Sequence, residues 1–171
     1  MKIAIMGFSG SGKSTLAKQL SAYYDIPLLY LDCVNFKENW AERDREECKK
    51  MVKTFMQNES WVIDGNYSEM DQAERLEQAD KIIILQYNRF VCMKGAFKRN
   101  RDYKGKVRES MADDCTERMD LWFFTWLVYK QYSKKRKNKF KSIKAKYPDK
   151  AVIIKSRKQL NAYLQNLKKY Y

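Results

Sequence analysis

The sequence predicts an α/β protein with a mostly parallel sheet that is covered by helices on both faces. The first observation is a set of short apolar runs that predict buried strands, at 2–6, 27–31, 60–63, 81–86 and 151–155. The second is that segments long enough for helices separate these runs, as in parallel sheets. The third is the length of 171 residues, which suits one domain with a substantial core. We therefore expect a single domain over 1–171.

Helices are predicted between these strands, chiefly where apolar residues recur three or four positions apart. In the first helix Leu16 and Leu20 lie on one face, and in the second the expected buried residues are Met51, Val52 and Phe55. The helices are expected at 13–24, 42–55, 69–79, 89–101, 119–146 and 156–169.

The segment before the longest of these helices has the weakest periodicity. Residues 102–117 are polar and charged, so we expect a loop or a lid, with the lid spanning about 101–118. The helix at 119–146 is aromatic in its first half and basic in its second, and Pro148 ends it.

Composition excludes several classes of chemistry. The chain has no histidine, which removes every mechanism that needs an imidazole base or a His-ligated metal. The four cysteines, at 33, 48, 92 and 115, are too far apart for a C-x-x-C zinc or redox motif. Scattered cysteines without a signal peptide predict reduced thiols in a cytoplasmic protein. The longest apolar stretch, 121–129, is too short to span a membrane.

The net charge of +14 is unevenly distributed. Residues 1–80 hold 10 basic and 14 acidic residues, a net of −4, whereas residues 81–171 hold 25 basic and 7 acidic residues, a net of +18. Within the basic half, 130–146 contains nine Lys or Arg and no acid. This asymmetry indicates an anionic partner: a nucleotide, a polynucleotide or a membrane surface.

The strongest motif is a phosphate-binding loop at 7–14, GFSGSGKS, which fits G-x-x-x-x-G-K-[ST] and lies between the first strand and the first helix. The glycines let backbone N–H groups approach phosphate oxygens, and the helix N-terminus adds partial positive charge. Lys13 is expected at the β- and γ-phosphates, Ser14 on Mg²⁺ and Thr15 near the α-phosphate. The expected ATP-binding residues here are Gly7, Ser9, Gly10, Ser11, Gly12, Lys13, Ser14 and Thr15.

Two aspartates follow predicted strands, where ligands bind in open α/β sheets. Asp64 is expected to hold Mg²⁺ directly or through water; the alternative is a turn residue before Gly65. Asp32 is expected to bind the hydroxyl of a phosphate acceptor, to act as a base or to complete the Mg²⁺ shell. Its alternative is a helix cap or turn residue.

Four stretches resemble the adenylate-kinase-like kinases, and within them the bacterial family of DNA topology modulation proteins. They are MKIAIMGFSGSGKSTLAKQL, LLYLDCVNFKENWAERDREE, WVIDGNYSEMDQAERLEQADKIIIL and YPDKAVIIKSRKQLNAYL. The resemblance covers nearly the whole chain. It implies a P-loop NTPase fold, a three-layer αβα sandwich whose five-stranded parallel sheet has the order 2-3-1-4-5, with a lid segment.

Arginines are the expected catalytic cations, because phosphoryl transfer depends on positive charge around the transferred group. The candidates are Arg89, Arg99, Arg101, Arg108, Arg118 and Arg136. The resemblance favours Arg101 beside the lid and Arg136 in the long helix as catalytic residues. Lys13 and Asp32, from their places in the sequence, are the other expected catalytic residues. The resemblance also places Arg157, after the last strand, beside the adenine; the alternative for 155–157 is a helix start capped by Ser156.

The basic run and the aromatic cluster before it each have two interpretations. The run at 130–146, with Phe140 and Ile143 as its buried stripe, is either a solvated helix face or a nonspecific contact with nucleic acid. The aromatic residues at 122–129 are expected mainly in the core, although consecutive aromatics wrap around a helix, and some can contact a substrate or a second subunit.

The first functional hypothesis is an ATP- and Mg²⁺-dependent kinase that phosphorylates a small nucleotide or nucleoside-like acceptor lined by Asp32 and 34–40. The second is an ATP-binding protein that affects DNA topology through a nucleic-acid contact and lacks small-molecule kinase activity. The third is a nucleotide-binding protein that has lost catalysis, against which Lys13, Ser14 and Asp64 argue.

Overall fold

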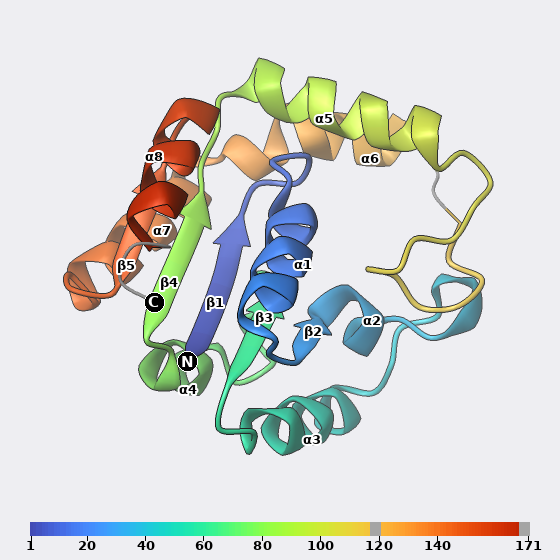
Figure 1. Ribbon diagram of the computed structural model, residues 1–171. Coiled ribbons are helices and arrows are strands. Elements are labelled where there is room, and N and C mark those ends of the chain that lie inside the picture. The colour runs from blue at the N-terminus through green and yellow to red at the C-terminus, as the bar shows by residue number, and fades with distance from the viewer. Residues whose placement is uncertain (117–120, 168–171) are drawn as a thin grey trace.

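The computed structural model describes residues 1–116 and 121–167, and these form one parallel sheet with helices on both faces (Figure 1). The strand order is β2-β3-β1-β4-β5, and every pairing is parallel, as predicted. The strands are β1 (Lys2–Gly7), β2 (Leu28–Tyr30), β3 (Trp61–Asp64), β4 (Lys81–Leu85) and β5 (Ala151–Ile154). The three central strands are almost completely buried, which explains why their sequences are continuous apolar runs.

Helices fill both outer layers, with α1 in front of the sheet and α7 behind it in the view of Figure 1. None of the described helices is long and apolar enough to cross a membrane. The α-helices are α1 (Lys13–Tyr24), α2 (Leu31–Asn35), α3 (Arg45–Met56), α4 (Gln72–Gln78), α5 (Arg89–Asp102), α6 (Leu121–Val128), α7 (Lys134–Lys146) and α8 (Arg157–Leu167). Two 3-10 turns, η1 (Glu38–Trp40) and η2 (Lys130–Tyr132), complete the set.

The prediction of one helix over 119–146 is wrong within its described part. The chain forms α6, η2 and α7 in succession, and Ser133 begins α7 by accepting a hydrogen bond on its Oγ from the backbone N–H of Arg136 at 3.4 Å. The break is fixed by contacts outside the segment: the Tyr132 ring packs on Phe8, with centroids 4.4 Å apart, and the Gln131 side chain is fully buried. Residues 119 and 120 lie outside the described part.

The second predicted helix begins later than expected, and this changes which residues it buries. Asp44 caps α3 by accepting hydrogen bonds from the N–H groups of Glu46 and Glu47, so the helix starts at Arg45. Of the three expected core residues, Val52 is buried, Phe55 is partly buried and Met51 is 39% exposed. The buried positions recur every four residues, at Cys48, Val52 and Met56.

Candidate active site at the carboxyl ends of the strands

The loop from Gly7 to Lys13 connects β1 to α1, and α5 packs directly against its backbone. An added Cβ on Gly10 would lie 2.1 Å from the carbonyl oxygen of Cys92, and one on Gly95 would lie 2.1 Å from the carbonyl oxygen of Gly10. Gly10 and Gly12 also have φ of +75° and +90°, a region that favours glycine. The close packing of α5 on the loop therefore requires glycine both at Gly10 of the motif and at Gly95 of the helix.

Polar side chains hold this loop at two points, Gly7 and Ser9. Asn66, just after β3, accepts a hydrogen bond from the Gly7 N–H at 3.0 Å and donates one to the Gly7 carbonyl at 2.8 Å. At the crest, the Ser9 N–H donates to Oε1 of Gln131 at 2.7 Å, and Gln131 donates to the carbonyl of Leu127 at 2.8 Å. The loop is thus tied to β3 on one side and to the break between α6 and α7 on the other.

Asp64 is the buried carboxylate of the site, and it lies at the end of β3 beside the first turn of α1. Its Oδ2 accepts a hydrogen bond from the Ser14 hydroxyl at 2.7 Å, whereas its buried Oδ1 has no hydrogen-bond partner among the described residues. Burial raises the pKa of Asp64 to about 6, opposed by the Lys13 charge and the Ser14 hydrogen bond. Carboxylate and hydroxyl oxygens are what Mg²⁺ prefers, so this pair fits that ion.

Asp32 lies close to this carboxylate, in the short helix α2 that the sequence analysis missed. The Tyr67 hydroxyl donates a hydrogen bond to Oδ1 of Asp32 at 2.8 Å, and the negative charge of Asp32 adds to the rise in the pKa of Asp64. Burial, followed by the charge of Asp32, raises the pKa of Tyr67, which keeps its proton on the phenol. Lys13, Ser14, Asp32 and Asp64 therefore form one cluster.

The segment between α5 and α6 folds over this cluster and contacts the region predicted to bind an acceptor. Its Glu109 pairs with Lys18 of α1, and its Cys115 donates to the carbonyl of Lys37 and accepts from the N–H of Trp40, both at 3.3 Å. An isolated bridge joins Val107 to Thr116. The predicted lid is thus an irregular segment packed on α1 and on the residues that follow α2; Glu117 and Arg118 lie outside the described residues.

Among the described candidate arginines, Arg108 of this segment is the one whose charge acts on Asp64. Its Nη1 donates to Ser110 at 3.0 Å, and its positive charge lowers the pKa of Asp64. Arg108 is one of the six candidate arginines, and no local signal in the sequence distinguishes it from the others, because only the fold of the lid brings it inward.

The three arginines favoured by the resemblance lie on three different helices. Arg101, at the end of α5, pairs with Asp102 at 3.0 Å and has a side chain that is 76% exposed. Arg136 lies over the Trp126 ring, 5.1 Å from its centroid, and burial lowers its pKa; its buried Nη1 has no hydrogen-bond partner among the described residues. Arg157 is exposed at the start of α8. Burial raises the pKa of Cys92, whose carbonyl contacts the loop, and the Arg157 charge opposes this rise.

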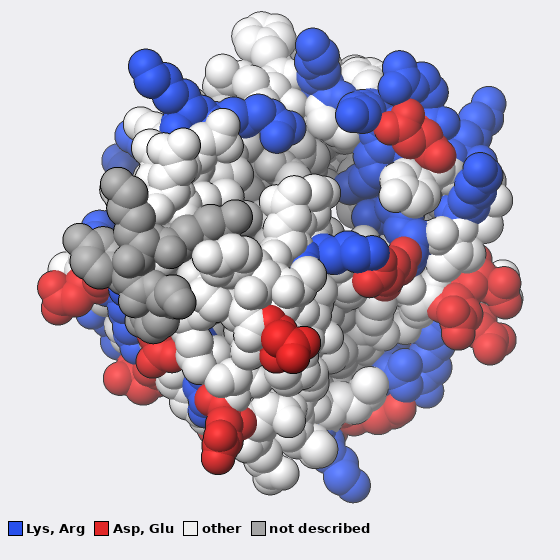
Figure 2. All heavy atoms as spheres, viewed as in Figure 1, with Lys and Arg blue, Asp and Glu red and all other residues white. Residues whose placement is uncertain are grey.

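The positive charge of the C-terminal half extends beyond the basic run at 130–146. Figure 2 shows Lys and Arg gathered over α5 and the segment after it, at the upper right of the view. The exposed cations of α5 and the segment after it are Arg89, Lys94, Lys98, Arg101, Lys104 and Lys106. The positive charge of the C-terminal half is therefore shared between this surface and α7.

Comparisons with known proteins support the fold. No family model matches the sequence. A solved shikimate kinase from Bacteroides thetaiotaomicron has a TM-score of 0.53 over 99% of this chain and 97% of that chain, at 17% sequence identity. This likeness shows the P-loop α/β fold. An uncharacterized protein from Eubacterium ventriosum has a TM-score of 0.49 at 19% identity, over 98% of this chain and 96% of that one.

One curated protein shares a segment with this chain. The ATP-dependent lipid A-core flippase of Haemophilus ducreyi is 46% identical over 103 residues, and the match covers 48% of this chain and 18% of the flippase. The chain therefore spans less than a fifth of that relative. The resemblance to DNA topology modulation proteins stays a prediction.

Proposed function

We propose that the protein is an ATP-dependent kinase that transfers the γ-phosphoryl group to a small nucleotide or nucleoside-like acceptor. The observation that carries this proposal is the Ser14–Asp64 contact at 2.7 Å. The buried carboxylate, whose pKa the Lys13 charge lowers, keeps one oxygen without a hydrogen-bond partner in the described part of the chain. This is the arrangement that binding of a metal-bound triphosphate requires. The P-loop fold shared with a shikimate kinase supports the proposal.

The nucleotide is assigned to the loop between β1 and α1. Its backbone N–H groups and the start of α1 bind the phosphates, and Lys13, which donates to the Phe8 carbonyl at 3.2 Å, turns to the β- and γ-phosphates. Ser14 and Asp64 would hold Mg²⁺, which neutralises charge on the phosphates. Arg157 lies beside the adenine in this assignment.

The acceptor is assigned to the space between Asp32 and the lid. Asp32 is oriented by the Tyr67 hydroxyl, so its other oxygen is available to accept a hydrogen bond from an acceptor hydroxyl and to take its proton. The lid excludes water, which suppresses wasteful hydrolysis of ATP. Arg101, Arg108 and Arg136 are the cations proposed to compensate charge on the transferred group.

A panel of acceptors tests the proposal. The protein with ATP and Mg²⁺ is given nucleosides, nucleoside monophosphates and sugars, and ADP formation is measured above the rate with water alone. We expect turnover with at least one nucleotide or nucleoside-like acceptor and none in Lys13→Ala, with the circular-dichroism melting curve of that variant unchanged. ATP binding without turnover on any acceptor would contradict the kinase assignment, and unchanged ATP affinity in Lys13→Ala would contradict the loop assignment.

A further inference from the structure

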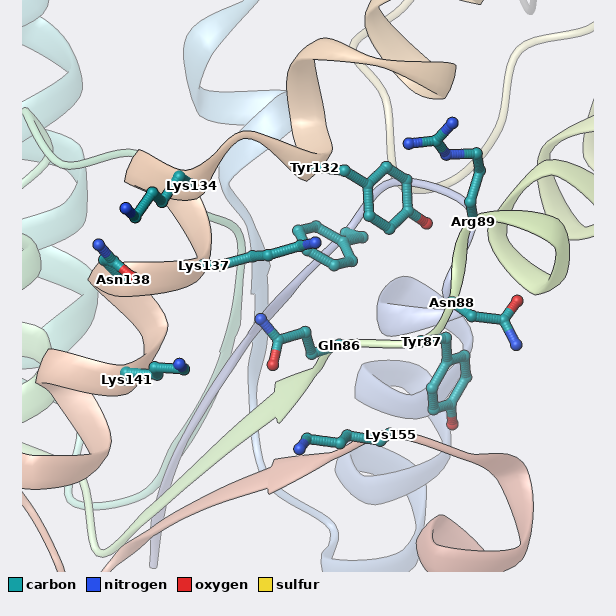
Figure 3. A pocket seen from close by; sticks show the side chains of 11 residues that line it. Gln86, Tyr87, Asn88, Arg89, Tyr132, Lys134, Lys137, Asn138, Lys141 and Lys155 are labelled. Carbon is teal, nitrogen blue, oxygen red and sulfur yellow. The ribbon is translucent and has the colours of Figure 1, made fainter.

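A second cavity lies apart from the Ser14–Asp64 contact, between α7 and the ends of β4 and β5 (Figure 3). Its volume is about 760 Å³. Gln86, Tyr87, Asn88 and Arg89, which follow β4, form one wall, and α7 forms the opposite wall. We call this cavity the basic cleft.

The basic cleft is lined by five cations and no acid. They come from three separate parts of the chain, and they are Arg89, Lys134, Lys137, Lys141 and Lys155. In Figure 3, Lys137 and Lys141 extend from α7, and Lys155 extends from the end of β5 on the other side. Within the described part of the chain, none of the five forms an ion pair with a carboxylate. Five like charges around one cavity repel one another unless an anion lies between them.

The proposed kinase does not use this charge. Lys13 and Ser14 begin α1, which lies in front of the sheet, and Asp64 ends β3, whereas α7 lies behind the sheet (Figure 1). Arg136, the residue of α7 assigned to the transferred phosphoryl group, does not line the basic cleft. The cleft therefore needs a separate ligand.

We propose that the basic cleft binds the sugar–phosphate backbone of a single nucleic-acid strand, without base specificity. Lys134, Lys137 and Lys141 form a row about 10 Å long at 1.5 Å per helical residue, which is longer than one phosphate group and matches a chain in which phosphates recur. Of the aromatic rings in the walls, Phe8 and Tyr87 are each 1% exposed, and the partly buried Tyr132 ring lies beside Arg89 and Lys137, 5.6 Å and 5.8 Å from its centroid. Binding therefore rests on phosphates more than on base stacking.

A single strand suits the cleft better than a duplex does. The cations lie on opposite walls of a concave site, so a ligand must enter between them to contact both, and a rigid duplex does not fit a cavity of about 760 Å³. A free nucleotide fills part of the cleft but cannot place phosphates along the whole row of lysines. The size and the charge pattern together favour a strand.

The test uses fluorescence anisotropy of a labelled deoxythymidine oligomer of about a dozen nucleotides, with the whole chain, in EDTA and without ATP. The cleft variant is Lys137→Gln/Lys141→Gln. The matched control is Lys135→Gln/Lys146→Gln, which removes the same charge from exposed positions of the same helix that do not line the cleft. Because no nucleotide is present, the result is independent of the kinase assignment.

The wild type should bind with an affinity that falls steeply between about 50 and 200 mM salt. Loss of two phosphate contacts should lower the salt slope by about 1.4 and the affinity near 0.1 M salt about 10- to 30-fold, and the control should change it less than about 3-fold. Equal losses in the two variants would overturn the proposal. So would tighter binding of a duplex of the same length, or competition by free ATP at the same concentration as the oligomer.

Discussion

Asp64→Asn should stabilise the protein while it removes Mg²⁺-dependent nucleotide binding. Asp64 is buried, and burial is the main reason why its pKa rises from 3.8 to about 6. An asparagine of nearly the same shape keeps an oxygen for the Ser14 hydroxyl and carries no charge into the interior. The residue that makes the site fit a metal therefore destabilises the fold when no metal is bound.

The size of this effect follows from the pKa shift. The folded protein binds the Asp64 proton more tightly than the unfolded chain does, so stability falls as the pH rises from about 4 to about 6 and changes no further above that. A shift of about two pKa units corresponds to about 3 kcal/mol at pH 7. Near pH 4 most of the cost is absent, so the difference between variant and wild type should grow by about 2 kcal/mol from pH 4 to pH 7.

Urea unfolding at a series of pH values, without Mg²⁺ or nucleotide, measures this difference. Asp149→Asn, which removes an exposed carboxylate, is the matched control. A difference between Asp64→Asn and wild type that does not vary with pH would refute the reasoning. A variant less stable than wild type at pH 7 would do the same, because it would show that the carboxylate is stabilised in place rather than strained by burial.

Three further substitutions test the contacts around the loop. A change from glycine to alanine normally stabilises a helix by about 1 kcal/mol. In Gly95→Ala, however, the added Cβ would meet the Gly10 carbonyl and displace the loop, so calorimetry should show ATP affinity at least about tenfold weaker. Tyr67→Phe releases Asp32, and kcat in a coupled ADP assay should fall about tenfold while ATP affinity holds. Gln131→Ala leaves an N–H of the loop unpaired and should lower the free energy of unfolding in urea by about 1–3 kcal/mol.

The first two of these have a control on an exposed surface. Lys94→Ala lies one residue before Gly95 on the exposed side of α5, and Tyr129→Phe removes a hydroxyl from a tyrosine that is 65% exposed. Wild-type ATP affinity in Gly95→Ala would show that the helix moves away from the loop at no cost. Equal kcat for Tyr67→Phe and Tyr129→Phe would remove Asp32 from the acceptor site.

The sheet and the loop were predictable because their signals are local. The five strands are continuous apolar runs in the sequence, and the GFSGSGKS motif fixes both the turn after β1 and the start of α1 at Lys13. The pattern also correctly placed Leu16 and Leu20 in the core.

The features that the sequence analysis missed depend on contacts between distant residues. The break between α6 and α7 is set by Gln131 and Tyr132 contacting the loop more than 120 positions earlier, and nothing in the local pattern of 119–146 predicts it. The Tyr67–Asp32 hydrogen bond likewise joins residues 35 positions apart. The exposure of Met51 is the exception, because a local signal indicates it. Asp44 is a helix cap with two glutamates in the turn after it, which places the start of α3 at Arg45 and changes the face that the helix buries.

The most direct test of the central claim is isothermal titration calorimetry of ATP with the wild type and Lys13→Ala, each in Mg²⁺ and in EDTA. The account predicts that the wild type binds ATP, that Mg²⁺ strengthens this binding through Ser14 and Asp64, and that Lys13→Ala weakens it by at least about tenfold. Equal affinity of the two proteins, with no difference between Mg²⁺ and EDTA, would contradict it.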